Sequence, residues 1–414
     1  MFSKKGWNTF LSALKKRDYS TIIFIAYMSV GLRILAMLCA IPIILILWIL
    51  KPVVWIKVGL LHSERLGHFS YNTDLFLRRR QLGIYPDGPY YCFLCNPTRS
   101  ANQQLLYMWK RVIPVYESRV FSVLFERMLP ILKRTPFYQA LRGDSNEYYE
   151  FNNANPSLYF TPDEIDKGRK LLKLMNVDFD TDEYICIFAR DSSYMKQHLP
   201  DLDMSYHDSR NTDINSLIET SKYLIEKGFT IIRVGSVVNK PINFSHKKMI
   251  DYPYSGHQSD FLDIFLQAHC KFTISAGNSG CTDVGIIFDT PILTVELADL
   301  GIAPVQKNSL YTPKKYKFIK SNDYLRFEDG LKLGTFWYNL DKFGLEVEAM
   351  SSQDILEAAK EMLDRVEGRF RYSPESENLI QAYHKFWDAI NFRGRSIKTP
   401  IGIDWLTKNK DIYF

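Results

Sequence analysis

Four polar segments of the sequence carry residues whose types and spacing could do chemistry. They span residues 63–74, 189–192, 206–213 and 275–280. Three of them directly follow apolar runs that we expect to be strands. In parallel α/β sheets, ligands bind at the carboxyl ends of the strands, beside helix N-termini. These segments are therefore the expected place of a binding site.

Arg190 and Asp191 come directly after the apolar run 184–189. A guanidinium group at the end of a strand can hold a diphosphate through two parallel hydrogen bonds, and it can neutralise the charge that builds up on a leaving nucleotide. The alternative is a surface contact between Arg190 and Asp191, which this motif alone would favour. We include both residues in the predicted binding site because other motifs are expected in the same sheet.

Segment 206–213 consists of polar and aromatic residues only, and it would make a poor core element. It could be a loop that caps the following helix, with Asn211 or Asp213 as the N-cap residue. Capping leaves His207 and Arg210 without a role. We therefore predict that these two side chains bind the ligand.

Segment 275–280 reads Ser-Ala-Gly-Asn-Ser-Gly and lies between an expected strand and an expected helix. Its glycines allow the backbone to approach a ligand closely, and the start of the helix offers unpaired N–H groups to a phosphate. The glycine spacing is not that of the dinucleotide-binding fingerprint, and strand-to-helix turns often contain Gly and Ser. The segment shares its predicted sheet with Arg190, which favours a binding role for Ser275, Gly277, Asn278, Ser279 and Gly280.

Segment 63–74 follows the first expected strand and begins a helix. Gly67 permits close approach, and His68 or Asp74 could remove a proton from an acceptor hydroxyl. Alternatively, Asp74 decorates the helix and His68 packs in the core; for His68 the two interpretations stand equal. We predict His68, Asp74 and Arg190 as catalytic residues.

The N-terminal region is apolar from residue 21 to 61, and its stretch 34–50 contains no charge. About 17 apolar residues are the lower limit for crossing a bilayer. Basic residues flank the region on both sides, which predicts that both ends are cytoplasmic. We therefore expect membrane attachment through a hairpin or re-entrant helix broken near Arg33 or Pro42, preceded by an interfacial amphipathic helix at residues 7–14. The alternative is an unusually apolar pair of buried helices.

Apolar runs and helix-like stretches alternate through the rest of the chain. Runs at 184–189, 229–234, 272–275 and 291–295 are typical of buried strands, and helical patterns lie between them. This order predicts a parallel doubly wound sheet. We expect an α/β chain with a membrane-associated helical segment at residues 1–52, a first Rossmann-like domain at 53–175, a second Rossmann-like domain at 176–345 and C-terminal helices at 346–414 that pack back on the body.

Composition and missing motifs exclude several other classes of protein. The net charge of +6 is gathered in scattered basic clusters, which suit a membrane surface or a phosphate ligand better than nucleic acid. The six cysteines lie mostly in apolar runs and are expected to be reduced. The sequence has no nucleophile elbow and no phosphate-binding P-loop. Asp201 and Asp203 lie in a polar loop, so we predict no metal site and no cofactor.

Taken together, these motifs resemble those of a family of predicted bacterial glycosyltransferases from surface-polysaccharide loci. The matching segments are residues 65–75, 190–194, 206–211, 250–252, 259–263 and 275–277. The resemblance implies GT-B architecture, in which two Rossmann-like domains face each other. It implies that the domain at 53–175 holds the acceptor and that the domain at 176–345 binds the nucleotide-sugar. The second half also faintly resembles O-fucosyltransferases, which implies that Arg190, Asn278 and Ser279 contact the donor diphosphate, with Arg210 or His207 nearby. It further implies that the reaction needs no metal.

The residues and the resemblance lead to one predicted function. A sugar is transferred from a nucleotide-sugar to a glycan or lipid-linked acceptor at the cytoplasmic face of the bacterial inner membrane, with membrane lipid as a further partner. The alternative is a non-catalytic scaffold of a polysaccharide assembly complex, although intact Arg190 and Arg210 argue against it. A transferase that moves the phosphate with the sugar would normally need acidic metal ligands, which are not evident.

Overall fold

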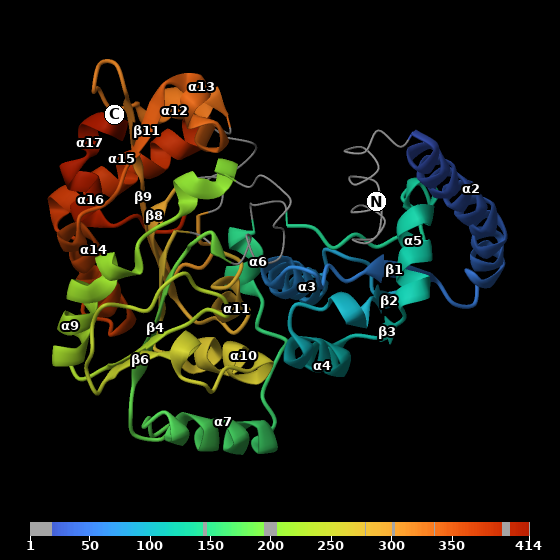
Figure 1. Ribbon diagram of the computed structural model, residues 1–414, viewed down its shortest axis with the longest axis horizontal. Helices are drawn as coiled ribbons and strands as arrows, with labels where there is room; N and C mark the ends of the chain where they lie inside the picture. The colour runs from blue at the N-terminus through green and yellow to red at the C-terminus, as the bar shows by residue number, and fades with distance from the viewer. Residues whose placement is uncertain are drawn as a thin grey trace. The chain divides into compact units, whose positions relative to one another are not determined.

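The computed structural model describes residues 19–143, 147–193, 205–277, 279–299, 303–334, 336–390 and 398–413 (Figure 1). The chain forms two compact units built from interleaved segments. The first contains the residues up to Ser63, Pro86–Ser100 and Trp109–Leu141, and the second contains Glu64–Tyr85, Ala101–Met108 and Arg142–Phe414. The sequence had suggested domains of continuous ranges.

The second unit contains a six-stranded parallel sheet. Its strands are β4 (Tyr184–Ala189), β5 (Thr230–Arg233), β6 (Met249–Asp251), β7 (Thr273–Ala276), β8 (Ile292–Leu297) and β9 (Leu310–Pro313), and their order is β6-β5-β4-β7-β8-β9. In order of sequence this is 3-2-1-4-5-6, the order of a doubly wound Rossmann-like sheet. The predicted parallel α/β fold is confirmed. The short outer strands β6 and β9 were not predicted.

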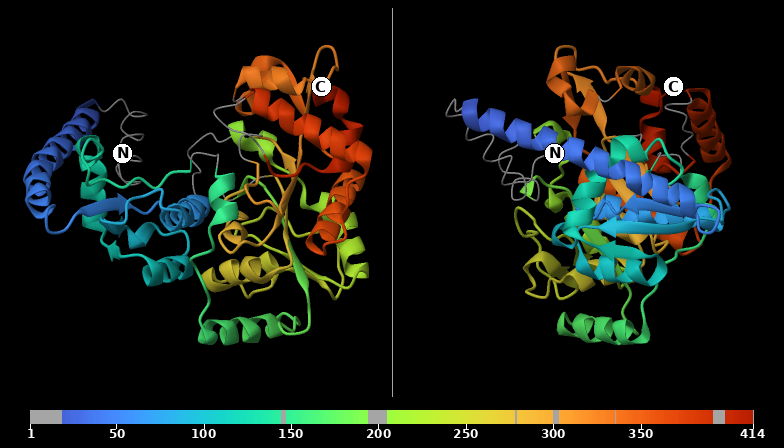
Figure 2. Two further views of the ribbon diagram at one scale, coloured as in Figure 1. Left: turned by 180° about the vertical axis from the view of Figure 1, so that it is seen from behind. Right: turned by 90° about the vertical axis from the view of Figure 1, so that its right-hand side faces the viewer.

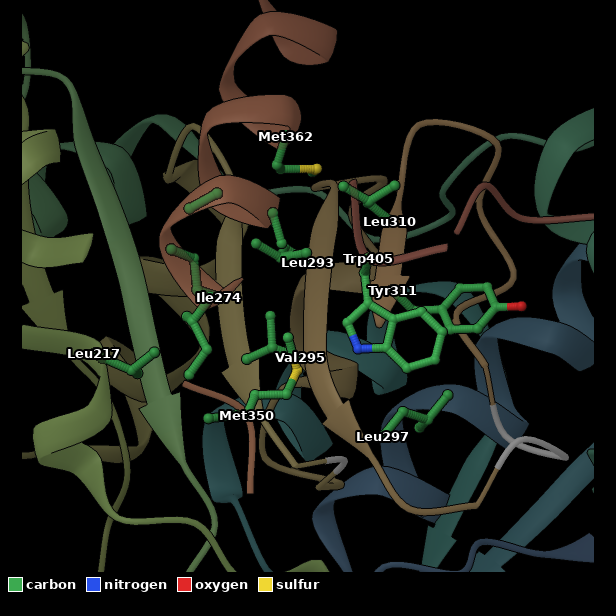
Figure 3. Close-up of a cluster of buried hydrophobic side chains, with 14 of the residues drawn as sticks. Leu217, Ile274, Leu293, Val295, Leu297, Leu310, Tyr311, Met350, Met362 and Trp405 are labelled. Atoms are coloured by element: carbon green, nitrogen blue, oxygen red, sulfur yellow. The ribbon is translucent and has the colours of Figure 1, made fainter. Parts of the chain in front are cut away.

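Helices cover both faces of this sheet because alternate side chains of each strand point to opposite faces. Ile185 and Ile187 of β4 belong to one core, with α9 (Ile218–Glu226), α14 (Ser352–Val366), α15 (Pro374–Ile390) and α16 (Ile403–Lys408). Tyr184, Cys186 and Phe188 belong to the other, with α7 (Pro162–Leu174) and α10 (Asp260–His269). Figures 1 and 2 show these two helical layers, and Figure 3 shows the first core between β7, β8 and β9 and the side chains of Met362 and Trp405.

The first unit contains a three-stranded parallel sheet of β1 (Ile56–Leu60), β2 (Tyr90–Cys95) and β3 (Val115–Glu117), in the order β1-β2-β3. Helix α5 (Arg119–Leu132) packs on α2 (Tyr19–Leu50) through a small apolar cluster. The strand that we expected before segment 63–74 is β1, which begins at Ile56.

Helix α2 corrects the prediction of a broken hairpin. It runs without interruption from Tyr19 to Leu50, with Pro42 inside it. Its buried face carries the small residues Ala36 and Ala40, which let α5 approach closely. Among the described residues, no helix is both long enough and apolar enough to cross a bilayer. The predicted amphipathic helix at residues 7–14 lies outside the described residues.

The remaining elements complete the two units. They are α3 (Leu66–Gln81), η1 (Pro97–Arg99), α4 (Gln103–Val112), α6 (Tyr148–Asn153), η2 (Ser205–Arg210), η3 (Ile214–Leu217), η4 (Tyr252–Tyr254), α11 (Asp283–Ile286), β10 (Lys315–Phe318), α12 (Phe327–Leu333), η6 (Phe336–Tyr338), α13 (Leu340–Phe343), β11 (Leu345–Glu348) and α17 (Lys410–Tyr413). Strands β10 and β11 pair antiparallel. All six cysteines are free, as expected.

Candidate anion-binding site

The topology of the six-stranded sheet brings two of the predicted segments together. Its strand order reverses between β4 and β7, and ligands of such sheets bind beyond the carboxyl ends of the strands at this switch point. Arg190 follows β4, and segment 275–280 begins in β7. The backbone N–H of Arg190 donates to the carbonyl of Ala276 at 3.0 Å. The two segments therefore leave the sheet side by side.

Arg190 is buried at this point, and the residues that follow η2 supply its hydrogen-bond partners. Its Nη1 donates to Oδ1 of Asn211 at 2.7 Å, and its carbonyl accepts from the N–H of Thr212 at 2.9 Å. Burial and the nearby charge of Arg210 lower the pKa of Arg190 to about 10, while Asp208 and Asp191 oppose this shift. Two like charges are thus held close together in a place that is poor in water.

Lys314, which the sequence analysis did not identify, adds a third cation. It is 7 % exposed and follows β9. Its Nζ donates to the carbonyls of Ser209 at 2.9 Å and Asn211 at 3.0 Å, which ties the end of η2 to the sheet. Burial lowers the pKa of Lys314; Glu296 raises it and Arg190 lowers it. The only sequence signal was the basic stretch around residue 314, because β9 itself was not predicted.

Gly277 is required for the close approach of this loop to η2. Its φ is +74°, and a Cβ atom there would lie 2.4 Å from the carbonyl oxygen of Arg210. Ser275 donates to the carbonyl of Gly277 at 2.7 Å, which holds the turn. The predicted close approach of the backbone therefore exists. The partner in the described contact is η2.

Three positively charged side chains thus gather at the switch point: Arg190, Arg210 and Lys314. The electrostatic effects on their pKa values show that Arg190 lies close enough to the other two for repulsion. An anion bound between them would relieve this repulsion, and hydrogen bonds from cations to phosphate are among the stronger ones in proteins. This arrangement suits a phosphate or diphosphate group.

Other residues of the same loops have partners within the protein. Asp191 accepts from the N–H groups of Ser193 at 2.8 Å and Asn239 at 2.9 Å, so it holds two loops together. Ser279 accepts weakly from the N–H of Cys281 at 3.3 Å. Asp213 caps η3 through the N–H of Asn215, as the capping alternative proposed. These contacts give Asp191 and Ser279 structural roles beside the predicted binding roles, which stay predictions.

Two of the predicted binding residues fall wholly or partly outside the described part of the chain. Asn278 lies outside the described residues. His207 belongs to η2 by its backbone, but its side chain lies outside the described part of the chain. Their binding roles stay predictions.

Comparisons with known proteins give little further guidance. No protein-family model matches the sequence, and no curated protein matches it significantly. A solved structure, the glycosyl transferase family 9 from Veillonella parvula DSM 2008, is similar with a TM-score of 0.42 and 10 % sequence identity. The similarity covers 75 % of this chain and 97 % of that chain. We draw no conclusion on fold or function from a likeness this weak.

The two predicted bases both lie on α3 in very different surroundings. His68 is exposed, so the alternative that placed it in the core is wrong. Asp74 is fully buried, and its Oδ2 accepts from Nε of Arg78 at 2.6 Å. Arg78 also donates to Asp289 at 2.7 Å and to the carbonyl of Ala154 at 2.7 Å, which ties α3 into the second unit. Burial raises the pKa of Asp74 to about 7 despite this pairing.

These contacts favour a structural role for Asp74, since a base must reach its substrate. The catalytic role of Asp74 stays a prediction. Another carboxylate, Asp283, interacts with one of the three cations. Arg210 acts on the pKa of Asp283, and Oδ2 of Asp283 lies against the backbone of Gly67 in α3. The sequence analysis did not single out this residue.

Proposed function

We propose that the site at the switch point binds the diphosphate of a nucleotide-sugar and that the protein is a metal-independent glycosyltransferase, transferring a hexosyl or deoxyhexosyl group. The observation that carries this proposal is the convergence of three cations: Arg190 after β4, Arg210 at the end of η2 and Lys314 after β9. Asp208 and Asp191 offset part of the repulsion between these like charges, and a bound anion would offset more of it. The acceptor is a glycan or a lipid-linked sugar of bacterial surface polysaccharide synthesis.

The reaction is a displacement at the anomeric carbon of the donor. An acceptor hydroxyl forms a bond to this carbon, while the bond between the carbon and the diphosphate oxygen breaks. The hydroxyl proton goes to a base, and the electron pair leaves with the nucleoside diphosphate. Arg190 and Arg210 stabilise the charge that develops on the leaving group, which is the larger part of such catalysis.

A thermal-shift screen against nucleotides and nucleotide-sugars tests the donor site. We expect one nucleoside diphosphate family to raise the melting temperature, because ligand at a hundred times Kd adds about 2.7 kcal/mol to stability. Arg190→Ala should abolish this shift. Arg169→Ala is the matched control, since Arg169 pairs with Asp180 and Asp166 at an exposed site. If no nucleotide shifts the folded wild type, the scaffold function replaces this proposal.

The proposal includes attachment to the cytoplasmic face of the membrane through α2. Ile34, Leu38, Ile41, Leu45 and Ile49 are each at least half exposed and recur at helical spacing. They form an apolar stripe on α2, away from the face that carries Ala36 and Ala40. Exposed apolar surface of this extent marks a site of contact with a membrane or another protein, and here it supports contact with lipid.

Aromatic and basic side chains lie at the C-terminal end of this stripe. Nζ of Lys51 is 4.8 Å from the ring centroid of Trp48 and 5.2 Å from that of Trp55. Trp and Lys favour the boundary between headgroups and hydrocarbon, and Lys attracts anionic lipids. The stripe and this cluster together support an anionic bilayer as the partner of α2.

A further inference from the structure

Asp283 is the first residue of α11 and stands at the end of the loop that leaves β7. Its carboxylate lies against α3, where a Cβ atom on Gly67 would be 2.7 Å from Oδ2. A Cβ atom on Gly67 would also be 2.6 Å from Cα of Gly280. Two glycines therefore make the space in which this carboxylate sits.

No hydrogen-bond donor within the described part of the chain serves the Asp283 carboxylate. Neighbouring acidic residues differ in this respect: Asp191 accepts from two backbone N–H groups, and Asp263 accepts from Tyr252 at 3.0 Å. A half-buried carboxylate without a donor is unfavourable for folding. A catalytic base, in contrast, needs free lone pairs to take up a proton.

The charges around Asp283 connect it to the anion site. Its charge interacts with those of Arg210 in η2, Tyr71 in α3 and Cys281 on its own loop, and so influences their pKa values or is influenced by them. Burial raises the pKa of Asp283 to about 7, with Arg210 opposing the rise. Arg210 also acts on Arg190, so the same guanidinium lies near both the carboxylate and the cation cluster. A sugar whose diphosphate is held by these cations would therefore extend close to Asp283.

We infer that Asp283 is the catalytic base that takes the proton of the acceptor hydroxyl. This inference rests on the proposed function and deepens it. As the acceptor oxygen forms its bond to the anomeric carbon, its proton passes to a carboxylate oxygen of Asp283. The bond to the diphosphate breaks in the same step, and the nucleoside diphosphate leaves with the electron pair. A base with a pKa near the working pH is effective because it is ionised yet still binds a proton well.

Asp283→Asn tests the inference, because it keeps the shape of the side chain and removes the base. The probe is the nucleotide-sugar that gives the largest thermal shift, and the reading is the release of its nucleoside diphosphate to water or to an added sugar acceptor. We expect kcat to fall by roughly 10²–10⁴-fold. The thermal shift by the donor should be kept.

Asp166→Asn is the matched control, since Asp166 lies exposed on α7 and pairs with Arg169 instead. It should leave kcat within about threefold, as expected for a residue outside the acid–base chemistry. The pH profile gives a second reading that does not depend on how well a variant folds. The kcat of the wild type should rise with pH up to an apparent pKa near 7, and the residual rate of Asp283→Asn should lack this rise.

The possible results separate the two proposals. If Asp283→Asn binds the donor and keeps the wild-type kcat, Asp283 is not the base and the glycosyltransferase proposal stands. A lost donor shift would make Asp283 a binding residue and overturn the inference, as would a wild-type profile that is flat between pH 6 and 8, on either side of the pKa of about 7. If the wild type neither binds nor turns over any nucleotide-sugar, the proposed function itself fails.

Discussion

Burial of the Asp283 carboxylate lowers the stability of the folded protein at neutral pH. In the unfolded chain its pKa is near 3.8, and in the folded protein burial raises it to about 7. The folded state therefore binds a proton more tightly than the unfolded state. The contribution of Asp283 to the free energy of unfolding is fully present below about pH 4. It is lost as the pH rises through about 7.

Asp283→Asn should accordingly stabilise the protein at pH 8 and leave its stability unchanged near pH 4. We expect a gain of about 1–2 kcal/mol at pH 8, less than a fully buried acid would give, because the side chain is partly hydrated. Urea denaturation of wild type and variant at both pH values measures it. Comparing the two proteins cancels the contribution of Asp74, whose pKa is raised in the same range. A variant that is less stable at pH 8 would mean that the carboxylate has a stabilising partner.

Residue types and spacing were enough to find Arg190 and Arg210, because both lie within recognisable polar segments. They were not enough to find Lys314 or Asp283. Lys314 follows β9, a strand of 4 residues that is too short to be recognised from its apolar pattern. Asp283 owes its surroundings to α3, about two hundred residues earlier. Such a contact is a product of tertiary packing and leaves no local signal.

The elements that carry these side chains meet through glycine. Gly67 lies in the first turn of α3, and Gly280 lies just before α11. Because neither has a side chain, the backbone of α3 reaches the loop that follows β7. Helix α3 is further held by its ion pair between Arg78 and Asp289. The position of α3 thus sets the space around Asp283.

Gly67→Ala should disturb this contact, because the added methyl group would lie 2.6 Å from Cα of Gly280, a backbone atom that cannot rotate away. We expect a loss of about 1–3 kcal/mol in the free energy of unfolding and a lower kcat. Gly285→Ala is the control. Its new Cβ would lie no closer than 3.5 Å to any neighbour, so stability should be unchanged or slightly higher. Equal stability of the two variants in urea would show that α3 moves freely against the loop.

Helix α2 shows where element prediction failed. A proline and an arginine inside an apolar run indicated a break, since proline removes a backbone hydrogen bond. The helix nevertheless continues through Pro42. Packing of Ala36 and Ala40 against Phe125 and Met128 of α5 stabilises one long element, and this tertiary contact could not be read from composition.

At the scale of the whole molecule, the two units differ in what they expose. The core of the second unit lies on both faces of a large sheet, and its pattern of buried strands was predicted. The first unit instead leaves a stripe of aliphatic side chains uncovered on α2. Exposed apolar stripes of this length are rare on proteins that meet only water. The location of the molecule therefore depends on what covers this stripe.

Co-sedimentation with lipid vesicles tests this dependence. We expect the full-length protein to bind vesicles that contain anionic phosphatidylglycerol, and to bind neutral phosphatidylcholine vesicles more weakly. A triple variant, Leu38→Ser, Leu45→Ser and Ile49→Ser, should lose about 2–4 kcal/mol of binding free energy, since burial of each aliphatic side chain is worth about 1.5–3 kcal/mol and insertion is partial. These three side chains are 57–76 % exposed, so the fold should tolerate the change.

The matched control replaces three scattered exposed aliphatic residues of the second unit: Leu174→Ser, Ile319→Ser and Leu333→Ser. It removes a similar number of apolar groups without touching α2, and it should bind vesicles as the wild type does. If both triple variants bind equally well, α2 does not meet the lipid. If only the α2 variant is released and its donor-induced thermal shift is intact, the nucleotide site and the membrane contact are separate functions of the chain. Turnover of a soluble acceptor should then survive the loss of membrane binding, while turnover of a lipid-linked acceptor should fall, because only the second substrate is concentrated at the bilayer.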